Sequence, residues 1–159
     1  MEQLIIRKAT REDLPSLHIF EQGVITAERP YDNMLKENPI KYYELEEMID
    51  NPSIELVVAV LHDHIIGSGY ARIEKAKPFF RYESYAYLGF MYVVPAYRGK
   101  GVNQLVIGYL KTWAQQHDIQ ELRLQVYADN LPAIKAYEKI GFTTEIVEMH
   151  FNTNNIPCV

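Results

Sequence analysis

Apolar residues recur at helical spacing in three parts of the chain. The clearest repeat predicts a helix with one apolar face, formed by Val102, Leu105, Val106, Tyr109, Leu110 and Trp113. Earlier in the chain, Thr10 stands three residues before Asp13 in a capping-box-like arrangement, which predicts a helix that runs into the mid-twenties. Near the end, a helix is expected to begin at Asn130 and to end at Gly141, with a buried face of Ala133, Ala136, Tyr137 and Ile140.

Runs rich in β-branched and aromatic residues predict the strands. Two runs flank a tight polar turn at His62, Asp63 and His64, which indicates a hairpin. The next run, residues 82–94, contains Gly89 at a position typical of a bulge or of close backbone approach. The remaining strands are expected at residues 4–8, 122–128 and 142–152, and a short acidic helix is expected within residues 42–52.

The resulting order of elements is β-α-α-β-β-β-α-β-α-β. Its first half contains antiparallel hairpins, whereas its second half contains β-α-β units, whose strands must be parallel. We therefore expect an α/β fold with a mixed sheet and helices on both faces. No repeat, low-complexity tract or linker interrupts the chain, so a single domain over residues 1–159 is expected.

Composition narrows the function mainly by exclusion. Apolar residues make up 48% and charged residues 23% of the chain, as in ordinary globular proteins. No apolar run has the length of a membrane span, the first residues lack the layout of a signal peptide, and Cys158 is a lone cysteine, so a cytoplasmic protein is expected. The net charge of −5 disfavours nucleic-acid binding, and a polyanionic ligand would need a local basic patch.

Such a patch occurs in the stretch "VVPAYRGKG", which joins a predicted strand to a predicted helix. Unpaired N–H groups and the helix dipole attract anions at this kind of junction. Gly99 and Gly101 allow close backbone approach, and Arg98 and Lys100 add positive charge. No segment matches a P-loop, and the third glycine of a dinucleotide-binding motif is missing. A plain turn with surface cations is the alternative interpretation.

Two linked motifs resemble those of the GCN5-related N-acetyltransferase (GNAT) family. The family's acyl-CoA motif, Q/R-x-x-G-x-G/A after a strand, corresponds here to residues 98–103. A second family block, N-x-x-A-x-x-x-Y-x-K-x-G-F, is present in full as Asn130, Ala133, Tyr137, Lys139, Gly141 and Phe142. The order of elements also resembles the family's, so the resemblance covers nearly the whole chain. It implies a mostly antiparallel sheet in which the fourth and fifth strands are parallel and splayed.

The resemblance implies an enzyme that transfers an acetyl group from acetyl-CoA to a primary amine, without a metal. Tyr137 would be the general acid that protonates the leaving thiolate; an apolar helix face is its alternative role. Asn130 would contact the pantetheine arm, or cap the helix that follows it. The implied donor-binding residues are Met91, Tyr92, Val93, Arg98, Gly99, Lys100, Gly101, Val102, Asn103, Asn130 and Ala133.

The chain departs from the family pattern at the general base. Relatives carry a glutamate at the position of Tyr87 or at the position of Gln125, and neither residue accepts a proton readily at neutral pH. Water held by Tyr85, Tyr87 or Gln125, or a carboxylate such as Glu28 or Glu83, could deprotonate the amine. Asn103 replaces the motif's last Gly or Ala, but it keeps the N–H group and tolerates unusual backbone angles.

Acceptor binding is expected around the segment "ERPYDN" and one face of the strand 82–94. Alternation would place Tyr85, Tyr87, Gly89, Met91 and Val93 on that face. Glu28 and Tyr31, with Tyr85, Tyr87 and Gln125, are the candidate acceptor-binding residues. Acidic side chains there could favour a cationic amine, although a solvated helix face explains most of them. The acceptor would be a small molecule or a peptide, and relatives are often homodimers; the alternative to an enzyme is a non-catalytic acyl-CoA sensor.

Overall fold

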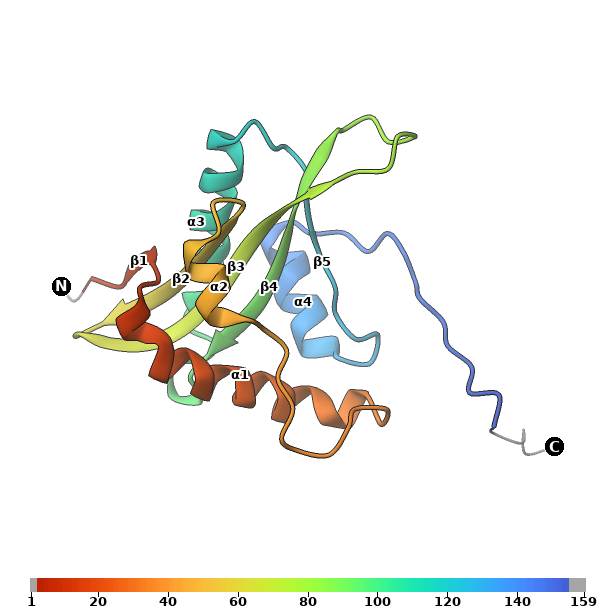
Figure 1. The fold of residues 1–159 in the computed structure, drawn as a ribbon, viewed down its shortest axis with the longest axis horizontal. Helices are drawn as coiled ribbons and strands as arrows, with labels where there is room; N and C mark the ends of the chain where they lie inside the picture. Colours follow the sequence, from red (N-terminus) through yellow and green to blue (C-terminus); the bar gives the residue numbers. More distant parts are fainter. Residues whose placement is uncertain (1–2, 155–159) are drawn as a thin grey trace. The chain divides into compact units, whose positions relative to one another are not determined.

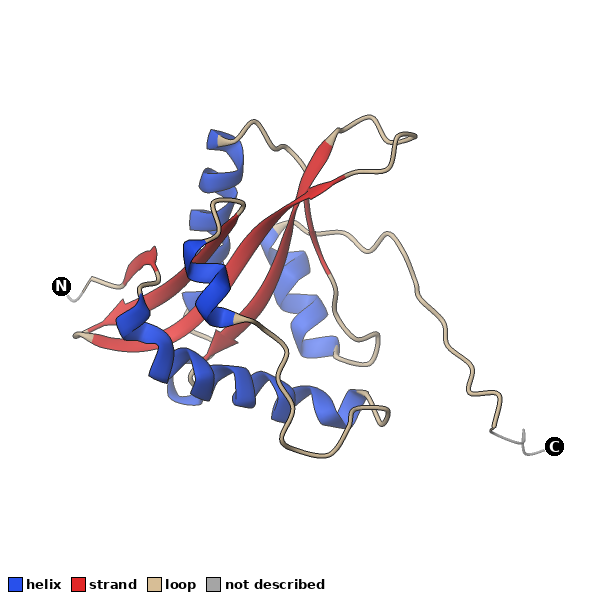
Figure 2. Ribbon diagram, viewed as in Figure 1, coloured by secondary structure: helices blue, strands red, loops and turns tan. Residues whose placement is uncertain are grey.

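The alternating apolar runs form a five-stranded sheet in the computed structural model, which describes residues 3–154 (Figure 2). The strands lie side by side in chain order, as β1 (Ile5–Lys8), β2 (Ile54–Leu61), β3 (His64–Lys75), β4 (Ser84–Val93) and β5 (Leu122–Leu124). Each neighbouring pair from β1 to β4 is antiparallel, and β4 with β5 is parallel. The expected mixed, mostly antiparallel sheet is therefore confirmed.

The predicted helices cover both faces of this sheet (Figure 1). Helices α1 (Leu14–Glu28) and α2 (Leu45–Asp50) lie on one face, and α3 (Val102–Gln116) lies on the other. Short 3-10 turns occupy Arg11–Asp13, Arg29–Tyr31 and Pro95–Tyr97. Within residues 3–154, no helix combines the length and the apolar composition that a membrane span requires.

Two apolar layers hold the helices to the sheet. On the α1 and α2 side, the buried side chains include Leu17, Phe20, Leu56, Val58 and Phe90. On the α3 side, the helical repeat predicted from the sequence supplies Val106 and Leu110, both fully buried. Leu105 of the same repeat is 49% exposed, so the apolar stripe is wider than the face that the sheet covers.

The chain groups into two compact units, the first ending at Gln125 and the second beginning at Val126. The sheet and helices α1 to α3 belong to the first unit. The second contains α4 (Leu131–Ile140), which begins after Asn130 and ends at Gly141 as predicted. None of its residues is fully buried, so the buried face expected from Ala133, Ala136, Tyr137 and Ile140 is wrong in that respect.

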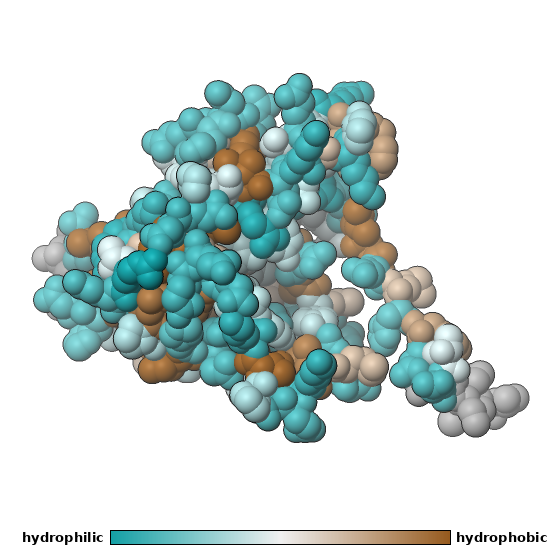
Figure 3. Space-filling model, viewed as in Figure 1, coloured by the Kyte–Doolittle hydropathy of each residue, from teal (hydrophilic) through white to brown (hydrophobic). Residues whose placement is uncertain are grey.

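Two strand predictions fail near the end of the chain. Strand β5 stops at Leu124, and residues 125–128 of the predicted strand are irregular. Residues 142–152, predicted as the last strand, contain no strand in the described chain. Their apolar side chains are exposed, Ile146 by 70% and Met149 by 89%, and lie beside hydrophilic ones in Figure 3. An alternating pattern specifies a strand only where a neighbouring strand supplies hydrogen bonds.

The start of α1 is held by a charged pair that the capping-box pattern partly anticipated. The Thr10 N–H donates to Asp13 Oδ2 at 2.7 Å, and the Arg7 guanidinium donates to both carboxylate oxygens at 2.7 and 2.9 Å. These hydrogen bonds lower the pKa of Asp13, with the bond from Arg7 as the largest cause. Asp13 itself is only 4% exposed, so β1 and α1 are joined through a buried carboxylate.

Replacing Asp13 by Asn should make the free energy of unfolding depend less on pH in the acid range. A carboxylate whose pKa is lowered by folding stabilises the protein fully above its unfolded pKa of about 3.9, and this contribution is lost as the pH falls through the folded pKa. We expect Asp13→Asn to cost about 1 kcal/mol at neutral pH, because Arg7 is partly exposed, and less at acid pH. Urea unfolding from pH 7 to pH 2 measures this; parallel profiles for both proteins would contradict it.

Candidate functional site

Strand β4 is longer than the ladder that joins it to β5. The parallel pairs are Ala86 with Leu122, Tyr87 with Arg123, and Leu88 with Leu124. Strand β4 then continues for five residues, to Val93, whereas β5 has ended. Within the described chain, the edge of β4 beyond Leu88 therefore lacks a strand partner on this side, and its backbone groups are open to a ligand.

A bulge interrupts β4 at this point. Ser68 of β3 pairs with Tyr92 and Tyr70 pairs with Gly89, so two residues, Phe90 and Met91, lie opposite one residue of β3. The backbone of Phe90 is left-handed, with φ of 57°, which is costly for a residue with a bulky side chain. The fully buried Ser68 hydroxyl donates to the Phe90 carbonyl at 3.0 Å. The bulge is thus supported from the neighbouring strand.

Gly89 lies beside the bulge, where the sequence indicated either a bulge or a close approach. A Cβ atom at this glycine would lie 2.5 Å from the Tyr70 hydroxyl, so close approach is confirmed at Gly89 itself. The extra residue of the bulge falls after it.

The bulge reverses the alternation of β4, so the single face predicted for this strand is wrong. Tyr87 packs against the core on the α1 and α2 side. Met91 faces α3 instead, since a Cβ placed on Gly69 would meet both Met91 Sδ and Val106 Cγ1 within 3 Å. Val93 pairs with Gly67, which also faces α3. Tyr85, Tyr87 and Gly89 share one face, but Met91 and Val93 belong to the other.

The glycine turn after β4 has the form of an anion cradle. Gly99 and Gly101 have φ of 72° and 82°, and no described atom lies within 4 Å of where their Cβ atoms would be. Helix α3 begins at Val102, and the first helical N–H to find an acceptor is that of Leu105, which donates to the Gly101 carbonyl. The amides before it point out of the helix start, where the helix dipole favours negative charge.

The two cations of the turn are held in different ways. Arg98 donates from its backbone N–H to the Pro95 carbonyl at 3.2 Å and from Nε to the Val93 carbonyl at 2.9 Å. Its guanidinium also lies 5.6 Å from the Tyr92 ring centroid. Lys100 extends over the Tyr97 ring at 5.4 Å. Arg98 therefore helps to shape the end of β4, and its backbone amide is already engaged.

Asn103, in the first turn of α3, replaces the small residue of the family motif. Its side-chain oxygen is buried and has no hydrogen-bond partner among residues 3–154. A buried acceptor without a partner costs free energy. The residue thus keeps its backbone N–H at the helix start while its side chain adds a polar atom beside the cradle.

Tyrosines gather on the α1 and α2 side of β3 and β4. Tyr43 contacts Tyr70 and Phe90 at ring-centroid distances of 5.9 and 4.6 Å, and Tyr70 lies 6.4 Å from Tyr87. Burial is the largest cause that raises the pKa values of Tyr43, Tyr70 and Tyr87. We call Tyr43, Tyr70 and Tyr87 the tyrosine cluster.

Tyr87 and Gln125, the two positions at which the family resemblance implies a glutamate base, meet at the edge of this cluster. The Tyr87 hydroxyl donates to Gln125 Oε1 at 3.4 Å. Arg72 lies over the Tyr87 ring at 5.2 Å and over the Tyr70 ring at 5.7 Å, and it forms an ion pair with Glu74. A cation thus already covers one of the tyrosines, Tyr87, that the sequence suggested for acceptor binding.

Glu21 is a buried carboxylate that the sequence analysis missed. It is 2% exposed, and its Oε2 accepts the backbone N–H groups of Tyr42 at 2.9 Å and Tyr43 at 2.7 Å. A charged residue on the apolar stripe of α1, between Leu17 and Val24, was the signal that could have revealed it. Glu21 fixes the loop that carries Tyr43 into the cluster.

The second motif, residues 130–142, forms the helix predicted for it. The Asn130 side chain accepts the Ala133 N–H at 3.4 Å, as an N-cap does. The Tyr137 ring contacts Phe142 edge to face at 5.9 Å, and Gly141, with φ of 122°, donates to the Tyr137 carbonyl. The motif residues therefore serve the helix and its ends, whatever their further roles.

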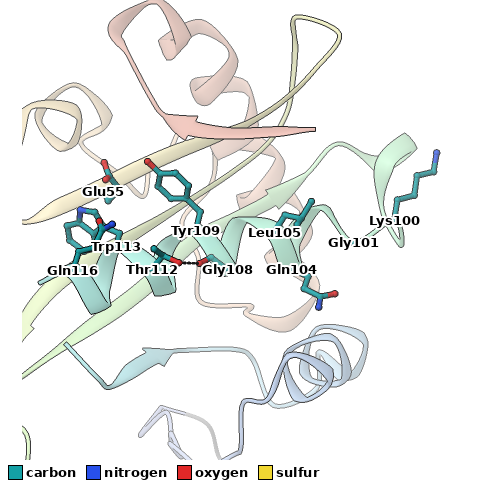
Figure 4. A pocket seen from close by; sticks show the side chains of 10 residues that line it. All are labelled: Glu55, Lys100, Gly101, Gln104, Leu105, Gly108, Tyr109, Thr112, Trp113 and Gln116. Atoms are coloured by element: carbon teal, nitrogen blue, oxygen red, sulfur yellow. Dashed lines mark hydrogen bonds between the residues drawn. The ribbon is translucent and has the colours of Figure 1, made fainter. Parts of the chain in front are cut away.

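A groove of about 780 Å³ runs along α3 from the glycine turn (Figure 4). Glu55 of β2 and Tyr109 of α3 point into it, and Lys100 and Gly101 lie at its other end. Burial raises the pKa of Glu55, and Lys8 Nζ lies 3.9 Å from its carboxylate. In residues 3–154, no three His, Cys, Asp or Glu side chains are grouped to hold a metal ion; His62 and Asp63 form the hairpin turn.

Replacing Glu21 by Ala should destabilise the first unit by about 2 kcal/mol, because two amides would lose an ionised acceptor. Glu21→Gln should cost less, since one amide oxygen still accepts. Ile19→Ala, on an exposed part of the same helix, serves as the control and should change the free energy of unfolding by less than about 0.5 kcal/mol. Urea unfolding measures all three; equal effects of Glu21→Ala and Ile19→Ala would contradict the assigned role.

Parts of the sequence are similar to known acetyltransferases. The uncharacterized N-acetyltransferase YobR of Bacillus subtilis is 38% identical over 69 residues, 43% of this chain and 28% of that protein. The streptothricin acetyltransferase of Escherichia coli is 40% identical over 47 residues, 30% of this chain and 27% of that protein. The matched segments thus span little more than a quarter of these relatives.

Solved structures match nearly the whole chain at low identity. A mutant of the BH1408 protein from Bacillus halodurans has a TM-score of 0.85 at 18% identity, over 93% of this chain and 98% of that one. A predicted acetyltransferase from Clostridium acetobutylicum, solved with acetyl-CoA, has a TM-score of 0.72 at 19% identity, over 94% and 96%. These likenesses show the same fold.

A family model provides the stronger evidence. The model of the acetyltransferase (GNAT) family matches residues 21–142, most of the chain, including the bulged strand, the glycine turn and the block that ends at Phe142. With the fold and both motifs in agreement, this chain belongs to the acetyltransferase (GNAT) family.

Proposed function

We propose that this protein transfers an acetyl group from acetyl-CoA to the primary amine of a small molecule or a peptide. The observation that carries the proposal is the open edge of β4, which leads directly into a glycine turn shaped as an anion cradle. A ligand with an extended amide chain and a pyrophosphate satisfies both features. Two similar proteins support the same class of reaction: one is a predicted acetyltransferase solved with acetyl-CoA, and the other is a streptothricin acetyltransferase.

The residues at the cradle fit the donor. The N–H groups of Gly99, Lys100, Gly101, Val102 and Asn103 bind the pyrophosphate, because the two glycines leave their side open. Arg98 contributes through its side chain, since its own N–H is engaged with Pro95. The backbone of Met91, Tyr92 and Val93 pairs with the amides of the pantetheine arm. By the family motif, Asn130 and Ala133 complete the donor site.

The chemistry is direct attack of the neutral amine on the thioester carbonyl. A C–N bond forms as the C–S bond breaks, and backbone N–H groups at the β4 bulge polarise the carbonyl oxygen. Tyr137, assigned by the family motif, gives its proton to the departing thiolate. A tyrosine, whose hydroxyl has a pKa of about 10 in water, can donate to a developing thiolate when it is held close to it.

A second candidate, a non-catalytic acyl-CoA sensor, is favoured by one observation. Neither family base position holds a carboxylate, and Tyr87 and Gln125 are bonded to each other. Calorimetry with acetyl-CoA and a thiol-release assay over a set of amines distinguish the two functions. Tight binding with no turnover of any amine would establish the sensor and overturn the enzyme. Within the enzyme proposal, the acceptor could also be the amine of a protein. The enzyme could also act as a homodimer.

Replacing Gly101 by Val should weaken acetyl-CoA binding about tenfold or more. A β-branched residue is strained at φ of 82°, by about 1–2 kcal/mol, and its side chain would occupy the open side of the cradle. Gly108→Ala, at an open position within α3, is the matched control and should bind normally. Calorimetry measures both dissociation constants, and unchanged affinity in Gly101→Val would remove the turn from the donor site.

Replacing Tyr137 by Phe should lower kcat about 100-fold, as expected for loss of a general acid, while acetyl-CoA affinity is nearly kept. Tyr109→Phe, which removes a hydroxyl in the α3 groove, should leave kcat as it is. Thiol release under saturating donor measures kcat for the three proteins. If kcat of Tyr137→Phe equals that of the unmodified protein, Tyr137 has no part in the reaction.

A further inference from the structure

Glu28 is the last residue of α1, at the point where the helix gives way to the turn Arg29–Tyr31. Its carboxylate lies within electrostatic range of the tyrosine cluster, because its charge raises the pKa values of Tyr43 and Tyr87. The Tyr42 side chain lies near the same carboxylate and lowers its pKa. Three elements, α1, the 42–43 segment and β4, thus converge on one acidic group.

The surroundings of Glu28 are held in place by the rest of the unit. Glu21, two turns earlier on α1, binds the amides of Tyr42 and Tyr43. Tyr43 in turn packs on Phe90, the bulged residue of β4. A chain of direct contacts therefore connects the helix that carries Glu28 to the backbone that would bind the acetyl group.

The other carboxylates of the region either have a partner or are exposed. Glu44 is paired with Lys41 at 2.8 Å, and Glu74 is paired with Arg72. Asp32 accepts the N–H of Met34 at 3.0 Å. Glu83 is exposed on the loop before β4. Glu28 is half-buried and makes no ion pair with any residue from 3 to 154. Its carboxylate is therefore available to pair with a cation.

Arg72 strengthens this assignment by occupying the competing site. A substrate ammonium could bind by cation–π contact to the Tyr70 and Tyr87 rings, but the Arg72 guanidinium already lies over both. An incoming ammonium is repelled from that side by the Arg72 charge. The nearby carboxylate of Glu28 is then the group that attracts it.

We propose that Glu28 binds the ammonium group of the acceptor and accepts its proton, the catalytic role that Tyr87 and Gln125 do not fill. This inference rests on the proposed acetyltransferase function. One N–H proton of the ammonium moves to the Glu28 carboxylate, and the lone pair left on nitrogen attacks the thioester carbon. The thiolate released from the C–S bond takes its proton from Tyr137. The new amide nitrogen gives up one further proton, which returns through water to Tyr137, and Glu28 releases its proton to solvent.

The charges around Glu28 suit a proton acceptor. Burial is the largest cause that raises the pKa of Glu28, and Asp32 raises it further, whereas Tyr42 opposes the shift. Glu28 in turn acts on Tyr43 and Tyr87, and both are neutral at physiological pH because their own pKa values are raised. A carboxylate with a raised pKa takes a proton more readily near neutral pH.

The test compares Glu28→Gln and Glu28→Asp with the unmodified protein. Thiol release from acetyl-CoA is measured with 2-phenylethylamine, tyramine, spermidine and a lysine peptide from pH 6 to pH 10. For the reactive amine, Glu28→Gln should lower kcat/KM about 100-fold at pH 7, with the loss shrinking as the pH rises and the amine loses its proton in solution. Glu28→Asp should recover part of the rate, and acetyl-CoA affinity should stay constant in both.

A matched control is Glu37→Gln, which removes one charge from the exposed loop after α1 and should leave the pH profile unchanged. A fluorinated, weakly basic analogue of the reactive amine adds a second measurement, because it is neutral at pH 7 and should react almost equally with Glu28→Gln. An equal loss for both amines assigns Glu28 a structural role and overturns the inference. So does a loss in Glu83→Gln that Glu28→Gln lacks.

The two hypotheses fail in different ways. If the unmodified protein acetylates an amine and Glu28→Gln keeps its rate and pH profile, Glu28 is not the proton acceptor but the acetyltransferase function stands. If the unmodified protein acetylates none of the four amines while binding acetyl-CoA, both the enzyme and the role of Glu28 are overturned.

Discussion

The bulge in β4 is the constraint on which the rest of the site depends. One extra residue at Phe90 forces the backbone into a left-handed conformation, and the buried Ser68 hydroxyl holds the carbonyl there. The bulge turns Met91 towards α3 and keeps Tyr87 on the opposite face. It also marks where β4 and β5 cease to pair. In a regular strand, Tyr87 and Met91 would lie on the same face, because side chains four residues apart point to the same side.

Helix α1 carries two glutamates, Glu21 and Glu28, whose environments differ in burial and in hydrogen-bond partners. Glu21 is fully buried and satisfied by two backbone amides, so its charge is used within the fold. Glu28 lies seven residues later at the helix end, where it is half-buried and lacks a cationic partner in the described chain. Under our proposal, this helix positions one carboxylate for the fold and another for the acceptor amine.

Much of the fold could be predicted because its patterns are local. The Thr10–Asp13 cap, the apolar repeat of α3 and the hairpin turn at His62 and Asp63 all depend on neighbours within a few residues. The failures involve partners distant in the chain. Residues 142–152 alternate as a strand does, yet a strand requires hydrogen bonds from another strand. The face assigned to Met91 was wrong because an alternation rule assumes a ladder without a bulge.

The sequence by itself determined the family, the glycine turn and the position of each motif residue, because these follow from residue identity and short spacing. Only the tertiary structure decided which carboxylate is left without a cation, since Glu28, Glu44 and Glu74 look alike until Lys41 and Arg72 are seen to pair with two of them. It also decided that Glu21 is internal and that Tyr87 faces away from Met91. Burial and pairing depend on contacts between residues far apart in the chain, which spacing alone does not encode.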